Sequence, residues 1–242
     1  MTALVLSAGG MFAAWEAGFW KVLSERFQPD IIVGTSAGAW NGWSIAGGAA
    51  PEDLIREWID PRTAGIMQWG LHRRGCLRPE TLHARAAELF ARFQPRLPFG
   101  LTLTELPWLR QVLVRDREIT WSHLAASASI PLCFPSVEIQ GRRYVDGGLR
   151  AALPLWAAEA MGATRILALQ VLNTLPFQIL RLVMRPRRPS RNIEVVQYEP
   201  SEPLGSLRDA AVWSPANMER WIALGERDAL RALLPLDGRA PR

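Results

Sequence analysis

Asp30-Ile31-Ile32-Val33-Gly34-Thr35-Ser36-Ala37-Gly38-Ala39-Trp40 is the stretch that decides the fold. An apolar run is followed by Gly-x-Ser-x-Gly and then by residues that favour a helix. This pattern is typical of a nucleophile elbow, a sharp strand-to-helix turn that holds a serine hydroxyl at the end of a sheet. We expect strained backbone at Ser36, and a Cβ at Gly34 or Gly38 would collide with the neighbouring strand or helix. The helix N-terminus behind Ser36 would favour a developing oxyanion. The pattern also arises by chance, so its place between strand and helix is what favours a nucleophile.

The composition fits one globular α/β domain over residues 1–242. Hydrophobic residues make up 49% of the 242 residues, charged residues make up 21%, and the formal net charge is +5. Such a chain is long and apolar enough for a sizeable core. Lys21 is the only lysine, so nearly all the positive charge is arginine. Arginine and the eleven tryptophans suit an anionic membrane surface, but they equally describe an ordinary core under a cationic surface.

Cysteine usage and the apolar stretches indicate a cytoplasmic protein. Cys76 and Cys133 do not make a disulfide framework, and the Cys and His spacing contains no zinc pattern. The N-terminus lacks the basic region of a signal peptide. The longest apolar stretch, from Ile166 to Met184, is interrupted by polar residues and does not predict a membrane-spanning helix.

Apolar periodicity predicts alternating strands and helices. The chain opens with a strand at Ala3–Ser7, a glycine turn, a helix at Phe12–Phe27 and the elbow strand, an order that predicts a mainly parallel sheet with right-handed crossovers. We expect Arg62–Gly75 to be irregular. Further helices are predicted at Pro51–Asp60, Pro79–Phe93, Trp121–Ser129, Leu155–Met161 and Asn217–Leu234, and further strands at Leu101–Leu106, Gln111–Arg115, Val137–Ile139, Arg143–Val145, Arg165–Val171 and Glu194–Tyr198.

The turn at Gly9-Gly10 has three interpretations. It could simply make room for the chain between strand and helix. A dinucleotide site is disfavoured, because the G-x-G-x-x-G spacing and an acidic residue after the elbow strand are absent. The third interpretation is an oxyanion hole, since backbone N–H groups at this sheet edge can point at a substrate carbonyl near Ser36.

A serine nucleophile needs a group that takes its proton. His72, His83 and His123 are the only histidines, and all precede Asp146, which excludes the order serine, acid, histidine with Asp146 as the acid. We expect solvated or capping roles for His83 and His123 and keep His72 as a reserve base. Asp146 follows a short strand and precedes two glycines, so its carboxylate could approach Ser36 directly, although Asp-Gly is also a common hairpin turn. A buried aspartate with a raised pKa can act as a base without histidine.

Four blocks of this chain resemble the patatin-like phospholipases, which are lipid acyl hydrolases with a Ser–Asp dyad. Leu6–Gly18 looks like the family's glycine-rich block, Gly34–Ala39 matches its elbow, Ala126–Pro135 resembles the segment before the acid, and Tyr144–Gly148 matches its Asp-Gly-Gly block. The resemblance implies a three-layer α/β/α fold around a mainly parallel central sheet. It also implies hydrolysis of lipid esters with no cofactor and no metal.

By this resemblance, Ser36 is the nucleophile and Asp146 is the general base. The oxyanion-binding residues that it implies are Gly9, Gly10 and Ala37, through their N–H groups, with Met11 near them.

The chain departs from the family pattern in the glycine-rich block. Ala8 and Ala13 stand where the family has glycines, and Phe12 stands where it has a basic residue. The family's asparagine after Asp-Gly-Gly is also absent. Because losing one oxyanion donor costs about 10²–10³ in rate, these changes imply weak activity or an uncharged ester. An inactive lipid-binding or partner-binding module of the same fold is the alternative.

Two further segments could contact lipid. Leu175–Arg191 combines apolar residues with clustered arginines, which suits peripheral contact with an anionic membrane surface and equally a solvated basic loop. Leu97–Leu109 is either a lid or a strand and turn. Nucleic-acid binding is not expected, because the other arginines are dispersed and no recognition motif is present.

Overall fold

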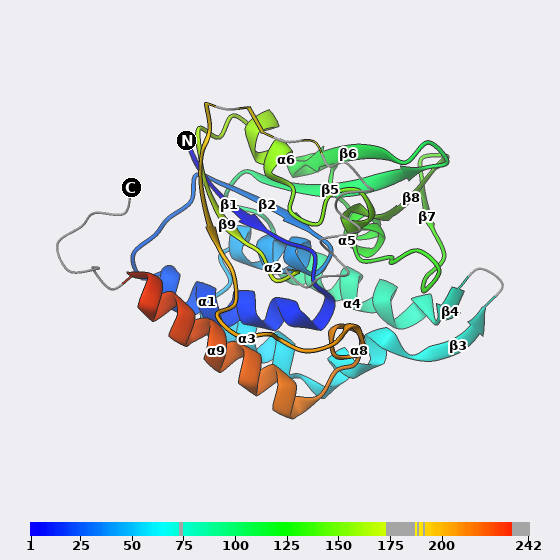
Figure 1. Ribbon diagram of the computed structural model, residues 1–242. Coiled ribbons are helices and arrows are strands. Elements are labelled where there is room, and N and C mark those ends of the chain that lie inside the picture. Colours follow the sequence, from blue (N-terminus) through cyan, green and yellow to red (C-terminus); the bar gives the residue numbers. More distant parts are fainter. Residues whose placement is uncertain (73–74, 173–186, 188, 191, 234–242) are drawn as a thin grey trace.

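The computed structural model describes residues 1–72, 75–172, 187, 189–190 and 192–233 (Figure 1). Within these residues the main sheet has eight strands in the order β10-β9-β1-β2-β5-β8-β7, and β6 pairs with β5. The strands are β1 (Thr2–Leu6), β2 (Ile31–Thr35), β5 (Phe99–Leu106), β6 (Arg110–Arg115), β7 (Val137–Ile139), β8 (Arg142–Asp146), β9 (Arg165–Leu169) and β10 (Glu194–Tyr198). A separate hairpin consists of β3 (Trp69–His72) and β4 (Gly75–Leu77).

Helices cover both faces of this sheet, as the three-layer prediction requires. Strands β10, β9, β1, β2 and β5 are parallel, and β6, β7 and β8 pair in antiparallel fashion. The helical segments are η1 (Gly10–Ala13), α1 (Ala14–Leu23), α2 (Ala37–Ala46), α3 (Pro51–Ile59), η2 (Pro61–Met67), α4 (Pro79–Arg92), η3 (Asp116–Glu118), α5 (Trp121–Ser127), η4 (Gly147–Leu149), α6 (Leu155–Ala160), α8 (Leu207–Ala211) and α9 (Pro215–Leu233).

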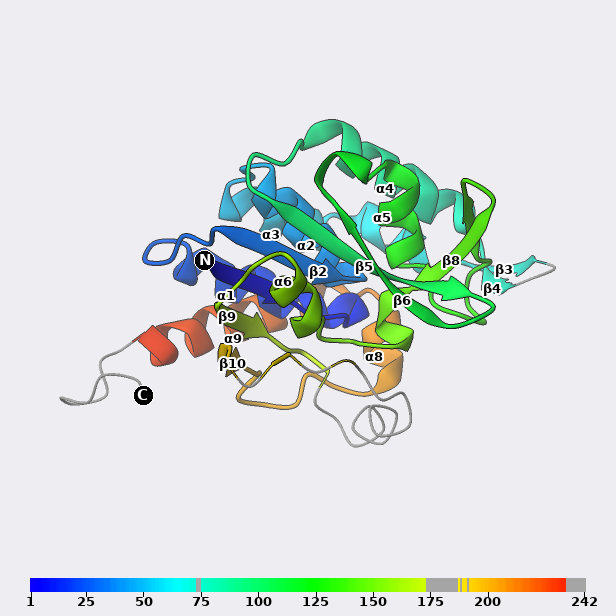
Figure 2. The same ribbon diagram turned by 90° about the horizontal axis from the view of Figure 1, so that it is seen from above.

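Alternation along β1 divides the core into two layers. Leu4 and Leu6 pack towards α1 and α2, whereas Ala3 and Val5 pack towards α6. This follows from the period of two in a strand, because successive side chains point to opposite faces. Seen from above, α6 lies over the sheet (Figure 2).

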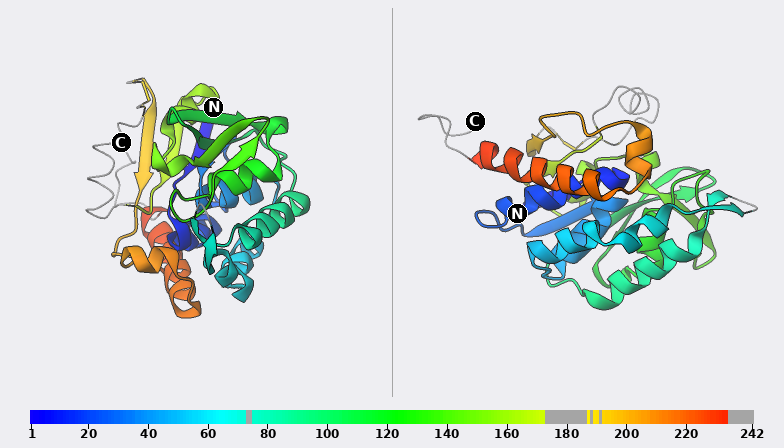
Figure 3. Two further views of the ribbon diagram at one scale, coloured as in Figure 1. Left: turned by 90° about the vertical axis from the view of Figure 1, so that its right-hand side faces the viewer. Right: turned by 90° about the horizontal axis from the view of Figure 1, so that it is seen from below.

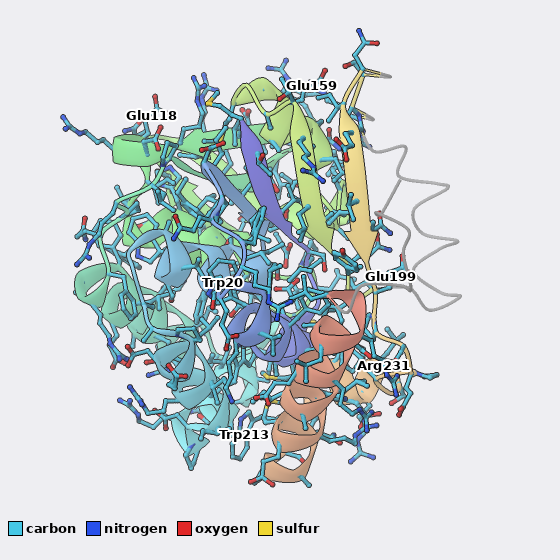
Figure 4. All side chains as sticks on the ribbon, turned by 90° about the vertical axis from the view of Figure 1, so that its left-hand side faces the viewer. Trp20, Glu118, Glu159, Glu199, Trp213 and Arg231 are labelled. Atoms are coloured by element: carbon cyan, nitrogen blue, oxygen red, sulfur yellow. The ribbon has the colours of Figure 1, made fainter. Side chains whose placement is uncertain are left out.

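The C-terminal helix closes the opposite face. Helix α9 lies along α1 (Figure 3), and the buried Trp15 indole donates to the Asp228 carboxylate at 2.9 Å. Trp213, labelled in Figure 4, precedes α9 and donates its Nε1 hydrogen to the carbonyl of Trp58 at 2.8 Å. These contacts hold α9 against α1 and α3.

The structure corrects several sequence-based expectations. The segment expected to be irregular, Arg62–Gly75, contributes to η2 and to the β3–β4 hairpin. The first helix begins as the 3-10 segment η1, and α8 was not predicted, because such short segments show little apolar periodicity. For Leu97–Leu109 the structure bears out the strand and turn, since the segment forms β5 and the start of a hairpin.

The basic segment Leu175–Arg191 falls almost entirely outside the described residues. Among the residues that are described, no helix combines the length and apolar character needed to cross a bilayer.

Candidate active site

Two strands end head to head along one edge of β5. Strand β6 pairs with Gly100–Glu105, β2 pairs with Phe99–Thr102, and β8 pairs with Leu103–Leu106. Because a strand has only two hydrogen-bonding edges, β2 and β8 share the edge that β6 leaves free. They run in opposite directions, so their C-terminal ends face each other. Ser36 follows the last residue of β2 and Asp146 is the last residue of β8, and this register brings the two residues together.

The backbone at Ser36 is strained, as expected from the elbow pattern. Its φ of 56° and ψ of −128° are unusual for a residue with a side chain. Ser36 is buried, and its carbonyl accepts hydrogen bonds from the N–H groups of Ala39 and Trp40 at 2.9 and 3.3 Å. The serine therefore sits at the start of α2, where the helix dipole is positive.

The two glycines of the elbow are required by close backbone contacts. A Cβ at Gly34 would lie 2.4 Å from the carbonyl oxygen of Gly38, inside α2. A Cβ at Gly38 would lie 2.4 Å from the carbonyl oxygen of Ser7, just after β1. Backbone atoms cannot move aside as a flexible side chain can, so the helix packs this closely only with glycine at both positions.

We expect Gly38→Ala to destabilise the fold by about 3 kcal/mol, at the upper end of the cost of overpacking, because the added methyl meets backbone. Chemical unfolding monitored by circular dichroism measures this loss. The matched control is Gly65→Ala, where the nearest atom is the Thr81 methyl at 3.1 Å. Equal stabilities for the two variants would contradict this account of the elbow.

Asp146 is buried, and both its side chain and its backbone N–H make hydrogen bonds. Its carboxylate accepts a hydrogen bond from the Gly148 N–H at 2.7 Å, and its N–H donates to the Ser129 carbonyl at 3.0 Å. Burial raises the pKa of Asp146 to about 6, although hydrogen bonds from the Ser36 side chain and the Gly148 N–H act to lower it. The carboxylate therefore ionises near neutral pH while it lies within reach of the serine hydroxyl.

A cavity of about 240 Å³ opens beside Ser36. Ser36 lines it together with three of the predicted oxyanion-binding residues, Gly10, Met11 and Ala37. Gly10 and Met11 begin η1 and Ala37 begins α2, and the first N–H groups of a helix have no acceptor within it. Gly9 packs differently, since a Cβ there would lie 2.1 Å from Val171 Cγ2.

The family model for patatin-like phospholipases matches residues 4–159, which is more than half of this sequence. The chain belongs to the patatin-like phospholipase family. The resemblance inferred from the sequence is thereby confirmed, and with it membership of a family of lipid hydrolases.

One solved structure shows the same fold at low sequence identity, and a second was matched with a lower TM-score. VipD from Legionella pneumophila has a TM-score of 0.55 and 10% identity, over 95% of this chain and 66% of that one. The type III effector protein ExoU has a TM-score of 0.45 and 14% identity, over 94% of this chain and 51% of that one. The patatin-like chain thus spans from about half to two thirds of these proteins. No curated protein matched it in sequence.

Phe12, which stands where the family has a basic residue, lies in the core of this patatin-like chain. Its ring is buried and meets Trp221 edge-on, with the ring centroids 5.0 Å apart. The side chain therefore stabilises the packing of η1 against α9. Residue 12 therefore offers no charged group to the site around Ser36.

The two histidine side chains that the structure describes make contacts with residues other than Ser36 and Asp146. His123 Nδ1 accepts a hydrogen bond from the Thr120 N–H at 3.1 Å, which confirms its predicted capping role. His83 is half-buried and contacts Trp121, with the ring centroids 5.8 Å apart. His72 belongs to β3, but its side chain is outside the described part of the structure.

Glu16 is a buried carboxylate that the sequence analysis did not single out. It accepts hydrogen bonds from the Ser7 N–H at 2.9 Å and from the Asn41 amide at 3.0 Å. Asn41 in turn accepts from the Trp58 indole at 2.9 Å. Burial raises the pKa of Glu16 to about 8, although the bonds from Asn41 and Ser7 lower it. The network ties the start of the glycine turn to α2, and its one sequence signal was an acidic residue among the apolar residues of α1.

Proposed function

We propose that this patatin-like chain hydrolyses carboxylic esters of lipids, with Ser36 as nucleophile and Asp146 as general base. The observation that carries the proposal is the head-to-head arrangement of β2 and β8, which places the buried carboxylate beside the elbow hydroxyl. Family membership supports a lipid substrate. The cavity beside Ser36 gives that substrate a place to bind.

The first half of the reaction forms an acyl-enzyme. Ser36 Oγ attacks the acyl carbonyl carbon while the Asp146 carboxylate takes the hydroxyl proton. The N–H groups of Gly10, Met11 and Ala37, with the N-terminus of α2, stabilise the negative oxygen of the tetrahedral intermediate. The ester C–O bond then breaks, and Asp146 returns its proton to the departing alcohol.

The second half releases the acid. Water attacks the acyl-enzyme, Asp146 takes a proton from it, and the Ser36 oxygen leaves with that proton. A carboxylate with a pKa of about 6 is a stronger base than an ordinary aspartate and is still mostly ionised at neutral pH.

The second candidate is a binding module of the same fold that does not react. Phe12 favours it, because an apolar side chain that packs in the core supplies no charge to the site. The two candidates differ in the reactivity of Ser36 alone, which can be measured without knowing the natural substrate.

Labelling with a fluorophosphonate ester separates the two candidates. We expect one covalent adduct per chain, located on Ser36 by peptide mass spectrometry and absent from Ser36→Ala. Ser24→Ala is the matched control, since Ser24 lies at the end of α1 and donates to the Lys21 carbonyl. A folded wild-type protein that stays unlabelled would favour the binding module.

A further inference from the structure

We propose that the cavity beside Ser36 is an acyl-chain site closed at its far end by ion pairs, so that the enzyme selects esters with acyl chains of medium length. This inference rests on the proposed function and adds to it the length of the acyl chain. It depends on the course, the wall and the far end of the cavity.

The cavity follows helix α2 away from the nucleophile. Ala37, Trp40 and Ser44 line it, and their spacing of three and four residues places them on one face of α2. On the neighbouring helix α4, Leu82, the first of its lining residues, belongs to a cluster that includes Trp40. The site therefore starts at Ser36 and continues between the two helices.

Helices α2 and α4 run in the same direction along the cavity. Near the start of both helices, Trp40 packs with Leu82, and further along, the Trp43 ring stacks on Phe90 with centroids 5.3 Å apart. Arg92, the last lining residue of α4, therefore lies at the end of the cavity that is distant from Ser36.

The wall between these ends is apolar or already hydrogen-bonded. Ser44 Oγ donates to the Trp40 carbonyl at 3.2 Å, and Thr63 Oγ1 donates to the Glu57 carbonyl at 2.8 Å. Asn41 is held by Glu16 and Trp58. An alkyl chain would therefore leave these polar groups satisfied. The apolar residues of the wall are Trp40, Leu54, Trp58, Ile66, Met67, Leu82, Leu89, Ile130 and Phe134.

A cluster of paired charges between α3 and α4 lines one side of the cavity and continues to Arg92 at its far end. Arg85, whose side chain is only 10% exposed, contacts Glu57 at 2.7 Å and Glu88 at 2.9 Å. Arg92 also pairs with Glu57, and with Asp53 at 3.1 Å. Each of these charges has an opposite partner, and Arg85 Nε is a buried nitrogen of the cluster without a hydrogen-bond partner. A methyl end could pass only by separating ion pairs.

The length of the apolar part sets the length of the chain. Ser44 lies eight positions after Ser36 along α2, and at 1.5 Å per residue this distance is about 12 Å. An extended carbon chain advances about 1.3 Å per carbon, since its bonds of about 1.5 Å alternate in direction. The site thus holds on the order of ten carbons. Its volume of about 240 Å³ is below the roughly 300–1,000 Å³ of sites for drug-sized ligands, which suits one such chain.

The test measures labelling of Ser36 by n-alkyl fluorophosphonates graded from ethyl to hexadecyl. Each added methylene is worth about 0.8 kcal/mol when buried, so the second-order labelling rate should rise up to fourfold per methylene. The rise should stop on the order of ten carbons, where the chain reaches the ion pairs. Rates that ignore chain length, or that rise up to hexadecyl, would overturn the proposal.

The chain length at which the labelling rate stops rising is called the break. Two variants should move the break to shorter chains. Leu89→Trp fills the distal part of the cavity from α4. Ile66→Trp narrows the cavity from η2, beside the cluster of Trp40 and Leu82, with less disturbance because Ile66 is only partly buried. Ala84→Trp is the matched control, since Ala84 is exposed on α4. Circular dichroism checks that each variant is folded. An unchanged break in both folded cavity variants would overturn the proposal.

Binding separates this inference from the reactivity of Ser36. The Ser36→Ala variant should bind free fatty acids of the same graded lengths, with a calorimetric affinity that levels off at the same length. A wild-type protein that resists labelling while Ser36→Ala shows this break would reject the proposed hydrolysis and keep the acyl site. Dicarboxylic acids of the same lengths carry a second carboxylate at the far end of the chain. If they bind more tightly than the fatty acids, the ion-pair cluster accepts an anion, which overturns the closed end.

Discussion

Asp146→Asn is expected to lower kcat for ester hydrolysis by about 10⁴, the upper end of what a positioned general base contributes. The upper end applies because the same carboxylate serves both half-reactions. Asparagine keeps the shape of the side chain and can still accept the hydrogen bond from the Gly148 N–H, so the fold should persist. Steady-state kinetics on a soluble ester, with circular dichroism for the fold, measures the effect.

The matched control is Asp116→Asn, which alters another aspartate that accepts a hydrogen bond from a backbone N–H. Asp116 accepts a hydrogen bond from the Phe99 N–H at 3.0 Å at the start of β5, away from Ser36. Its replacement should leave kcat within a small factor. Full activity in Asp146→Asn would reject the dyad and return attention to His72 as the base.

The pH profile of kcat/KM for the wild-type protein also tests Asp146 as the general base. Only the ionised carboxylate can take the serine proton, so kcat/KM should fall as the pH drops through about 6, the pKa of Asp146, and then by tenfold per pH unit. An acidic limb near 3.8, the ordinary value for aspartate, would mean that the essential carboxylate is not buried.

The elbow could be predicted from the sequence because its cause is local. Two glycines, a serine and an apolar run within one short stretch require a tight strand-to-helix turn, and the structure has that turn with φ of 56° at Ser36. The position of Asp146 is different. It depends on β5 being long enough for β2 and β8 to share one edge, a long-range register with no signal in either local pattern.

The cavity was beyond sequence reasoning for the same reason. Its wall combines α2, α3, η2 and α4, and η2 lies in the stretch expected to be irregular. Each contributing residue resembles an ordinary core position in its own helix. Only the parallel course of α2 and α4 shows that their apolar faces leave a cavity between them.

The buried carboxyl group of Glu16 should make the stability of the fold depend on pH. Its pKa is about 8 in the folded protein against 4.5 as the ordinary value. Between these pH values the folded state holds a proton that the unfolded state releases, so stability is fully present below 4.5 and is lost as the pH rises to about 8. At about 1.4 kcal/mol per pH unit, the loss over this interval is several kcal/mol.

Glu16→Gln should remove this slope, because glutamine does not titrate. We therefore expect the difference in unfolding free energy between wild type and Glu16→Gln to change by several kcal/mol between pH 4.5 and 8, in favour of the variant at high pH. Urea unfolding across that range measures this change, and taking the difference between the two proteins cancels the pH dependence that comes from other groups such as Asp146.

A constant offset in unfolding free energy is expected as well, since the glutamine amide places a donor against Ser7 or Asn41. The exposed Glu25→Gln, two residues after the end of α1, should leave the slope unchanged. A pH-independent difference for Glu16→Gln would mean that Glu16 stays ionised in the fold, with the hydrogen bonds from Ser7 and Asn41 outweighing its burial.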